Sequence, residues 1–142
     1  MKRALSVLLS ITVMCSIASF ATAEADIEKG ILAIQETIKA VFGDSDFESM
    51  FEKDSFETAI SESGWIVVSA DVGWKIGYFA QGDPSTAEMI SVVWNVLASA
   101  SREYTDAEVY FMVRYEGENI YLAMPIGVYD IRYSTVYDHK AP

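Results

Sequence analysis

The chain has 142 residues, 51% of them hydrophobic, and its 21 acidic residues outnumber 10 basic ones to give a net charge of −11. This length predicts one domain with a core large enough to fold alone. The strong negative charge excludes nucleic acid as a partner and argues against an anionic membrane surface, because phosphates would be repelled. It permits a basic partner or a metal cation without requiring either.

The first residues have the pattern of a secretory signal peptide. Lys2 and Arg3 supply a positive start, a short apolar stretch follows, and residues 21–23 read Ala-Thr-Ala, the small-x-small pattern that signal peptidase cleaves. The apolar stretch is too short for a membrane-spanning helix, so an uncleaved anchor is the weaker alternative. We expect removal of residues 1–23 and export of residues 24–142 to the periplasm or the cell exterior as a single small α+β domain, with no membrane insertion after cleavage.

Cleavage at this site also removes Cys15, the only cysteine, and two basic residues, which takes the net charge from −11 to −13. A lipid anchor on Cys15 is rejected, because Met14 occupies the position where lipoprotein signal peptidases need a small residue. The exported domain then has no thiol for a disulfide, although its compartment would permit one.

The exported part begins with an amphipathic helix. Asp26 is its expected N-cap and Gly43 its stop. Between them, five apolar residues recur at spacings of four, three, four and three: Ile27, Ile31, Ile34, Ile38 and Val41. Such a stripe predicts a helix with one face toward the core.

The next stretch, residues 44–57, reads DSDFESMFEKDSFE and partly matches the pattern of a calcium-binding loop. Asp44, Asp46 and Glu48 fit the first ligand positions, but Ser49 stands where the loop needs glycine and Ser55 where it needs a bidentate glutamate. No metal site is therefore predicted, and a weak divalent-cation site remains an alternative.

A helix explains the same residues better. Ser45 and Glu48 form a capping box. Asp54 or Ser55 then caps a further helical turn that carries Phe56 and the apolar residues up to Ile60. The prediction is a helix over residues 46–62 whose acidic side faces solvent.

From Trp65 the apolar period changes to two and predicts a hairpin. A three-residue loop at residues 71–73 sets Val68 opposite Ile76, with apolar pairs along that whole face. Trp65 and Phe79 then pair on the opposite face.

The segment GDPSTAE opens a second helix, which runs to about Ser101. Its apolar side is broad and predicts deep burial: Met89, Ile90, Val93, Trp94, Val96, Leu97 and Ala100.

A second hairpin is predicted over residues 109–126, with Gly117 and Glu118 at the centre of its turn. This register sets Val113 opposite Leu122 on the buried face and Arg114 opposite Tyr121 on the other face. Pro125 cannot donate to a ladder, so its strand should stop there or lie at an edge. Residues 128–136 predict one more strand, and the tail from Tyr137 is expected to fray.

Together these elements predict an α+β fold, a two-layer sandwich with an antiparallel sheet of four or five strands and helices on one face. The order is α(α)-ββ-α-ββ(β). The expected core includes Val68, Ile76, Phe111, Val113 and Leu122.

The sequence lacks the common catalytic motifs. After cleavage it has one histidine, His139, close to the C-terminus, which is a poor place for a catalytic triad or a zinc site. No nucleotide-binding glycine pattern is present, so no cofactor is expected. The alternative to a non-enzymatic protein is a small hydrolase that acts on an envelope polymer through carboxylates such as Glu103, Asp106 and Glu108.

The second face of the predicted sheet carries the candidate site. If helices cover the other face, this one presents an aromatic surface for an unknown protein or small ligand: Trp65, Phe79, Tyr110, Met112, Arg114 and Tyr121. The 46–62 helix or a dimer mate is the alternative occupant. The sequence thus predicts an exported small acidic binding or inhibitor-like module.

Overall fold

The computed structural model describes residues 23–41, 51–52, 54–72 and 84–139. Its described elements are a helix at residues 23–41, β1 (Glu57–Ile60), β2 (Ile66–Asp71), α2 (Pro84–Arg102), β3 (Val109–Tyr115), β4 (Glu118–Met124), β5 (Gly127–Asp130) and β6 (Thr135–Tyr137). The six strands form one mixed sheet in sequential order, β1-β2-β3-β4-β5-β6. The α+β class is confirmed.

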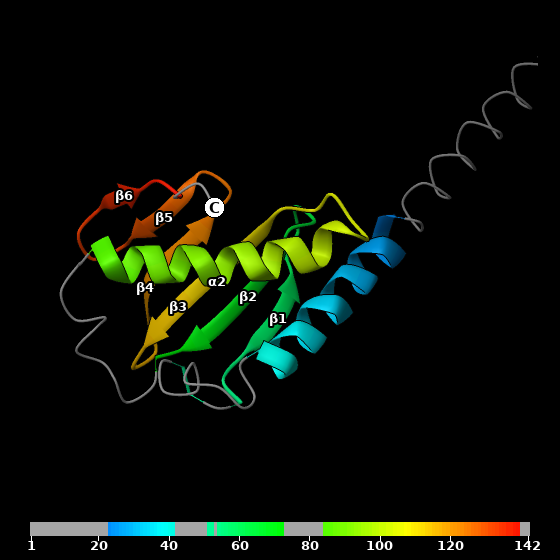
Figure 1. The fold of residues 1–142 in the computed structure, drawn as a ribbon, viewed down its shortest axis with the longest axis horizontal. Helices are drawn as coiled ribbons and strands as arrows, with labels where there is room; N and C mark the ends of the chain where they lie inside the picture. The colour runs from blue at the N-terminus through cyan, green and yellow to red at the C-terminus, as the bar shows by residue number, and fades with distance from the viewer. Residues whose placement is uncertain (1–22, 42–50, 53, 73–83, 140–142) are drawn as a thin grey trace, which may run out of the picture.

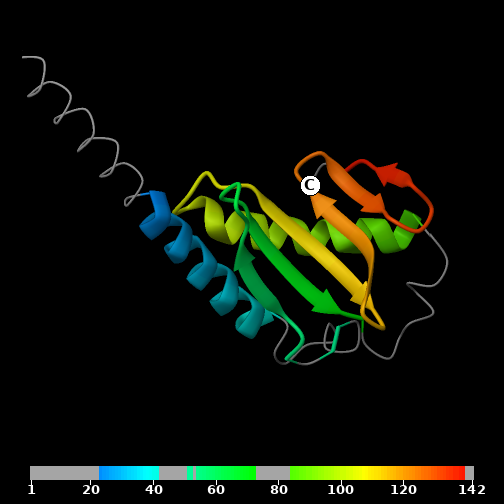
Figure 2. The same cartoon turned by 180° about the vertical axis from the view of Figure 1, so that it is seen from behind.

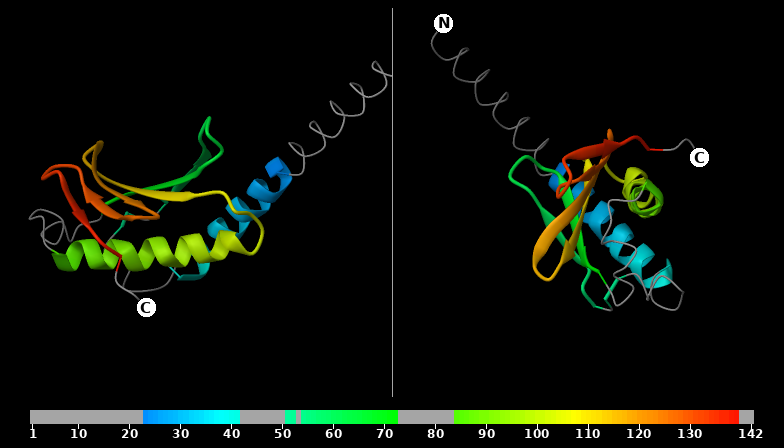
Figure 3. Two further views of the ribbon diagram at one scale, coloured as in Figure 1. Left: turned by 90° about the horizontal axis from the view of Figure 1, so that it is seen from above. Right: turned by 90° about the vertical axis from the view of Figure 1, so that its left-hand side faces the viewer.

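The two helices lie on the same side of the sheet. α2 packs across β3, β4 and β5, and the helix at residues 23–41 lies beside β1 (Figure 1). Gln35 Nε2 of that helix donates a hydrogen bond to Thr58 Oγ1 of β1 at 2.9 Å. Views from above and from the end show both helices under the same face (Figure 3).

The sheet is mixed because β2 and β3 run parallel, with Val68 opposite Phe111. α2 lies between these two strands in the chain. A helix that crosses over the sheet returns the chain to the end where the first strand began, so the next strand runs in the same direction. The prediction of an antiparallel sheet of four or five strands is therefore wrong in both strand count and strand direction.

The predicted helical turn at residues 56–60 is also wrong, because residues 57–60 form the edge strand β1. Asp54 has a φ of 65°, and Ser55 Oγ accepts a hydrogen bond from the Asp71 backbone N–H at 3.0 Å. Small polar side chains that cap helices also close turns, so these two residues turn the chain into a strand. The greater part of the predicted acidic helix, residues 42–50, lies outside the described residues.

β2 does not pair as the first predicted hairpin requires. Val68 lies between Thr58 of β1 and Phe111 of β3, so both hydrogen-bonding edges of β2 are occupied. The predicted pairing of Val68 with Ile76 is therefore wrong. Residues 74–79, the second strand of that hairpin, lie outside the described residues.

The second hairpin forms with a different register. Glu116 and Gly117 occupy the turn with φ values of 48° and 81°, which places Tyr115 opposite Glu118. This left-handed pair fits a two-residue hairpin turn one residue earlier than predicted. A bulge then adds Ile120 to β4, after which residue 113 lies opposite residue 121.

This change of register moves the side chains of β4 to the other face. Tyr121 and Ala123 are fully buried in the core, whereas Leu122 is half-buried on the opposite face. A shift of one residue always exchanges the two faces of a strand. The predictions that Leu122 belongs to the core and Tyr121 to the open face are both wrong.

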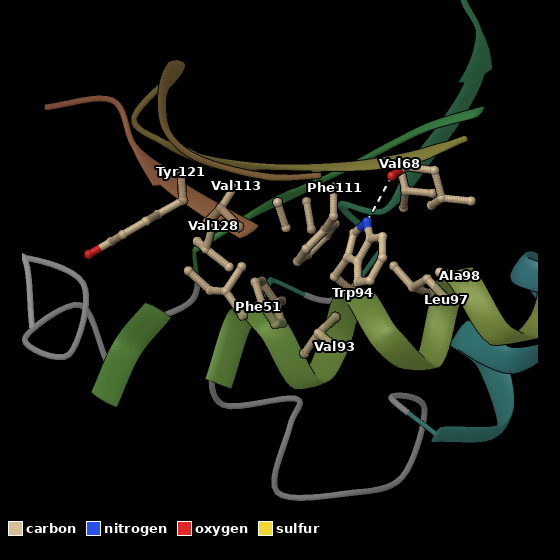
Figure 4. Close-up of a cluster of buried hydrophobic side chains, with 14 of the residues drawn as sticks. Phe51, Val68, Val93, Trp94, Leu97, Ala98, Phe111, Val113, Tyr121 and Val128 are labelled. Carbon is tan, nitrogen blue, oxygen red and sulfur yellow. Dashed lines mark hydrogen bonds between the residues drawn. The ribbon is translucent and has the colours of Figure 1, made fainter. Parts of the chain in front are cut away.

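The core lies between α2 and the sheet (Figure 4). Val68, Phe111 and Val113 are fully buried as predicted, and Trp94 Nε1 donates a hydrogen bond to the Val109 carbonyl at 2.7 Å. Ile34 of the N-terminal helix is also fully buried, which confirms the core-facing stripe of that helix. Predicted core residue Ile76 lies outside the described residues.

The C-terminal segment forms two short strands where one was predicted. Asp130 Oδ1 accepts hydrogen bonds from the Arg132 and Tyr133 backbone N–H groups at 3.1 and 3.3 Å. This carboxylate holds a turn, and Ser134 follows with a φ of 50°. β4 ends at Met124, directly before Pro125, as the missing proline donor requires.

The prediction that the chain frays at His139 is wrong. The His139 ring stacks on Trp94 with centroids 4.4 Å apart, and its Nε2 lies 2.6 Å from the Met124 carbonyl. Its Nδ1 lies 2.5 Å from Ser91 Oγ of α2. Because Nε2 donates to the carbonyl, Nδ1 accepts from the serine hydroxyl. These contacts hold the described C-terminal segment against α2.

Candidate functional site on the open face of the sheet

The face of the sheet opposite the helices is open among the described residues (Figure 2). Alternation places Val67, Ser69 and Asp71 of β2 on this face, because residues 66, 68 and 70 point into the core. In the parallel register these residues lie beside Tyr110, Met112 and Arg114 of β3. We call this surface the open face.

An aromatic pair lies at one end of the open face. Trp65 and Tyr110 stack with centroids 4.7 Å apart and an interplanar angle of 29°. Trp65 is 40% exposed, which leaves much of its ring free for a ligand. Aromatic rings at such positions offer large contact area at small entropic cost.

The tyrosine of this pair is held by a carboxylate. The Tyr110 hydroxyl donates a hydrogen bond to Glu108 Oε2 at 2.8 Å. Burial, followed by this hydrogen bond and the charge of Glu108, raises the pKa of Tyr110 above its ordinary value. The hydrogen bond to Glu108 gives the Tyr110 ring a defined position beside Trp65.

The middle of the open face is apolar. Met112 lies opposite Leu122 of β4, and Leu122 lies opposite Tyr129 of β5. All three side chains are half-buried although no described helix covers them. A methionine in such a row adapts its shape to different partners.

The other end of the open face carries an arginine held between two strands. Arg114 Nε donates to Asp71 Oδ1 at 2.8 Å, and Arg114 Nη1 lies 3.5 Å from Glu57 Oε2. This arrangement ties β1, β2 and β3 together across the open face. The two carboxylates offset the charge of Arg114, so it adds no net positive charge to the surface.

Four of the six predicted site residues share this face: Trp65, Tyr110, Met112 and Arg114. Phe79 lies outside the described residues. Tyr121 is fully buried on the helix side and is removed from the site, for the register reason given above. Leu122 and Met124 take the places on β4 that were predicted for Tyr121 and its neighbours, because the bulge at Ile120 shifts the pairing of β4 by one residue.

A second concave region lies at the end of the fold where the N-terminal helix begins. It has a volume of about 1020 Å³ and is lined from residues 23–28, 60–64 and 102–107. Its lining includes Glu103 and Asp106, two of the carboxylates singled out in the sequence, together with Glu62. Glu108, the third, instead bonds Tyr110 on the open face.

Two further features bear on the chemistry of the molecule. Within the described ranges, no cluster of three or more His, Cys, Asp or Glu side chains has the arrangement of a metal site.

The Ser91–His139 pair resembles part of a hydrolytic site, but Ser91 is only 4% exposed. A nucleophile without access cannot reach a substrate, so we assign this pair a structural role.

Comparisons with known proteins identify no relative: no family model, no curated protein and no solved structure matches this chain. In the part of the chain that the structure describes, no helix is long and apolar enough to span a membrane. Functional inference therefore rests on the side chains of the open face and of the concave region.

Proposed function

We propose that this protein is an exported, non-enzymatic binding or inhibitor-like module that acts in the periplasm or outside the cell. The observation that supports the proposal most is the alignment of Trp65, Tyr110 and Met112 on a sheet face that no described helix covers. Contiguous apolar and aromatic surfaces of this kind mark sites of interaction with a protein or small ligand. Aromatic residues and arginine also dominate the binding energy of interfaces.

The proposed location depends on the sequence of residues 1–23, which lie largely outside the described part of the chain. A positive start, a short apolar stretch and an Ala-Thr-Ala site together are typical of exported proteins. An acidic exported domain remains dispersed by its charge, so an uncovered apolar face is tolerated until its partner binds.

Photo-crosslinking in the native cell tests this function. A photoreactive amino acid at Met112, in the middle of the open face, should give one discrete adduct, because the side chain lies in the proposed contact. The same amino acid at Glu36, exposed on the N-terminal helix, serves as the control. Absence of a Met112 adduct, or equal adducts from both positions, would refute the proposal.

The alternative function is a small hydrolase that acts on an envelope polymer. The concave region favours it, because Glu103 and Asp106 line the same hollow. Glycoside cleavage needs two carboxyl groups about 5–10 Å apart on either side of the scissile bond. Release of soluble sugar from purified envelope polymer, lost in both Glu103→Gln and Asp106→Asn, would establish this alternative in place of binding.

A further inference from the structure

We propose that the partner of the open face is a positively charged protein segment that also carries apolar side chains, an inference that rests on the proposed function. The apolar part of the argument comes from the row that joins Met112 to Leu122 and Tyr129. These side chains are covered favourably only by apolar side chains of a partner. A fully hydrophilic cation would leave them uncovered.

The charge of the partner follows from the groups on the open face that are charged at neutral pH. Among the described residues these are Glu57, Asp71, Glu108 and Arg114. Arg114 already bonds Asp71 at 2.8 Å and lies 3.5 Å from Glu57, so its charge is offset within the surface. The surface that remains is negative, and Glu57 projects into solvent with 70% of its side chain exposed.

The surroundings of the aromatic pair are negative as well. Residues 61–64 and 103–107, which follow β1 and α2, lead directly into Trp65 and Glu108, and their Glu62, Glu103 and Asp106 line the second concave region. Arg102 is the basic residue among the described residues that line it. A cation near the exposed Trp65 ring gains both from these carboxylates and from the face of the indole.

The same charges disfavour the other occupants of an apolar face. A second copy would bring the negative surfaces of two acidic chains together, since the 21 acidic residues all lie after the predicted cleavage site and only 10 basic residues are present in the full sequence. An anionic polymer or lipid surface would be repelled in the same way. A basic protein segment satisfies both the apolar row and the acidic surroundings, and its association would be accelerated by electrostatic attraction.

The test uses the purified, isotope-labelled protein and three synthetic peptides of equal length. In each peptide, every second residue is apolar, either Val or Tyr. The positions between them are all Lys in the first peptide, all Ser in the second and all Glu in the third. Backbone amide shifts report both the affinity and the location of binding. We expect the Lys peptide to shift amides of β2 and β3, to bind at least about tenfold more tightly than the Ser peptide, and to weaken as salt is added.

Matched variants assign the charge effect to this surface. The double variant Glu57→Gln with Glu108→Gln should weaken the Lys peptide by about three- to tenfold. The control, Glu36→Gln with Glu88→Gln, removes the same charge from the helix layer and should leave the affinity unchanged. Equal effects of both double variants would mean general attraction to an acidic protein and would overturn the inference.

Three other outcomes would overturn it. Equal binding of the Lys and Ser peptides on β2 and β3 would support a binding site on the open face but refute its preference for a positively charged partner. Shifts confined to residues 23–28 and 102–107, or no binding of the Lys peptide, would refute the assigned partner. A stable dimer with the open face protected would identify a second copy as the occupant. In each case, the Met112 crosslink still reports whether the open face binds a partner at all. Failure of the proposed function is therefore distinguished from failure of the charge preference.

Discussion

Tyr121 and Asp130 lie directly opposite each other on β4 and β5, both with fully buried side chains. Among the described residues, neither the Tyr121 hydroxyl nor Asp130 Oδ2 has a hydrogen-bond partner at normal hydrogen-bond geometry. Arg132 is close to both, with its guanidinium 5.5 Å from the Tyr121 ring centroid and its Nε 3.9 Å from Asp130 Oδ1. Burial, followed by the charge of Asp130, raises the pKa of Tyr121 to about 12, against the opposing effect of Arg132.

Tyr121→Phe should therefore change the dependence of stability on pH. Folding holds the phenol neutral, with a pKa of about 12 against the ordinary value of 10.0, so its contribution is present below pH 10 and is lost as pH rises toward 12. The wild type should lose up to about 2–3 kcal/mol more than Tyr121→Phe over this interval. Urea denaturation at several alkaline pH values measures the difference.

The same variant gives a second expectation near neutral pH. Because the hydroxyl makes no hydrogen bond of normal geometry to a described residue, its removal should leave the free energy of unfolding unchanged or raise it by about 1 kcal/mol. Tyr133→Phe, at an exposed position, is the control. A loss of more than about 1 kcal/mol at neutral pH in Tyr121→Phe would show that the hydroxyl is hydrogen-bonded after all.

Neighbouring residues on β3 should respond oppositely to the same substitution. Val113 is fully buried, so Val113→Asp places an unpaired charge in the core and should lower stability by more than about 4 kcal/mol, enough to unfold the domain. Met112→Asp, on the open face, should stay folded with a change within about 1 kcal/mol. Circular dichroism and thermal melting distinguish them, and a folded Val113→Asp protein would contradict the assignment of faces.

Two tryptophans provide a matched test of burial. Trp94→Phe removes the donor to the Val109 carbonyl and part of the stack on His139, and should lower stability by about 2–4 kcal/mol. Trp65→Phe retains a ring over Tyr110 at a partly exposed site and should cost less than about 1 kcal/mol. Similar melting temperatures for both variants would disagree with the fold.

His139→Ala should reveal how strongly the C-terminal segment is held. The change removes a ring stack and two hydrogen bonds, so we expect a loss of about 1–3 kcal/mol in chemical denaturation. Asp138→Ala, at the exposed neighbouring position, should change stability by less than about 0.5 kcal/mol. If both variants behave alike, the contacts of His139 contribute nothing measurable.

Export can be tested directly by locating the N-terminus of the protein. N-terminal sequencing of the protein recovered from the cell envelope or the medium should begin at Glu24, because cleavage is expected after Ala23. Recovery from the cytoplasm with Met1 retained would remove the proposed location.

The sequence by itself determined those elements whose apolar residues repeat over many turns or alternate along a strand. The stripe from Ile27 to Val41 and the broad apolar side of α2 identify helices without any knowledge of what they contact. Alternation likewise assigned Val68, Phe111 and Val113 to the core, and Tyr110 and Met112 to the other face. Periodicity is a property of a single segment, so it can be identified from the sequence alone.

The tertiary structure alone decided which strands pair, and at what register. The four residues of β1 are too few to show a period, and their strand form depends on the free edge that β2 offers. The parallel β2–β3 pair depends on where α2 crosses the sheet. One bulged residue, Ile120, moved Tyr121 from the expected binding face into the core. Such choices depend on contacts between segments distant in sequence, and a shift of one residue exchanges the two faces of a strand.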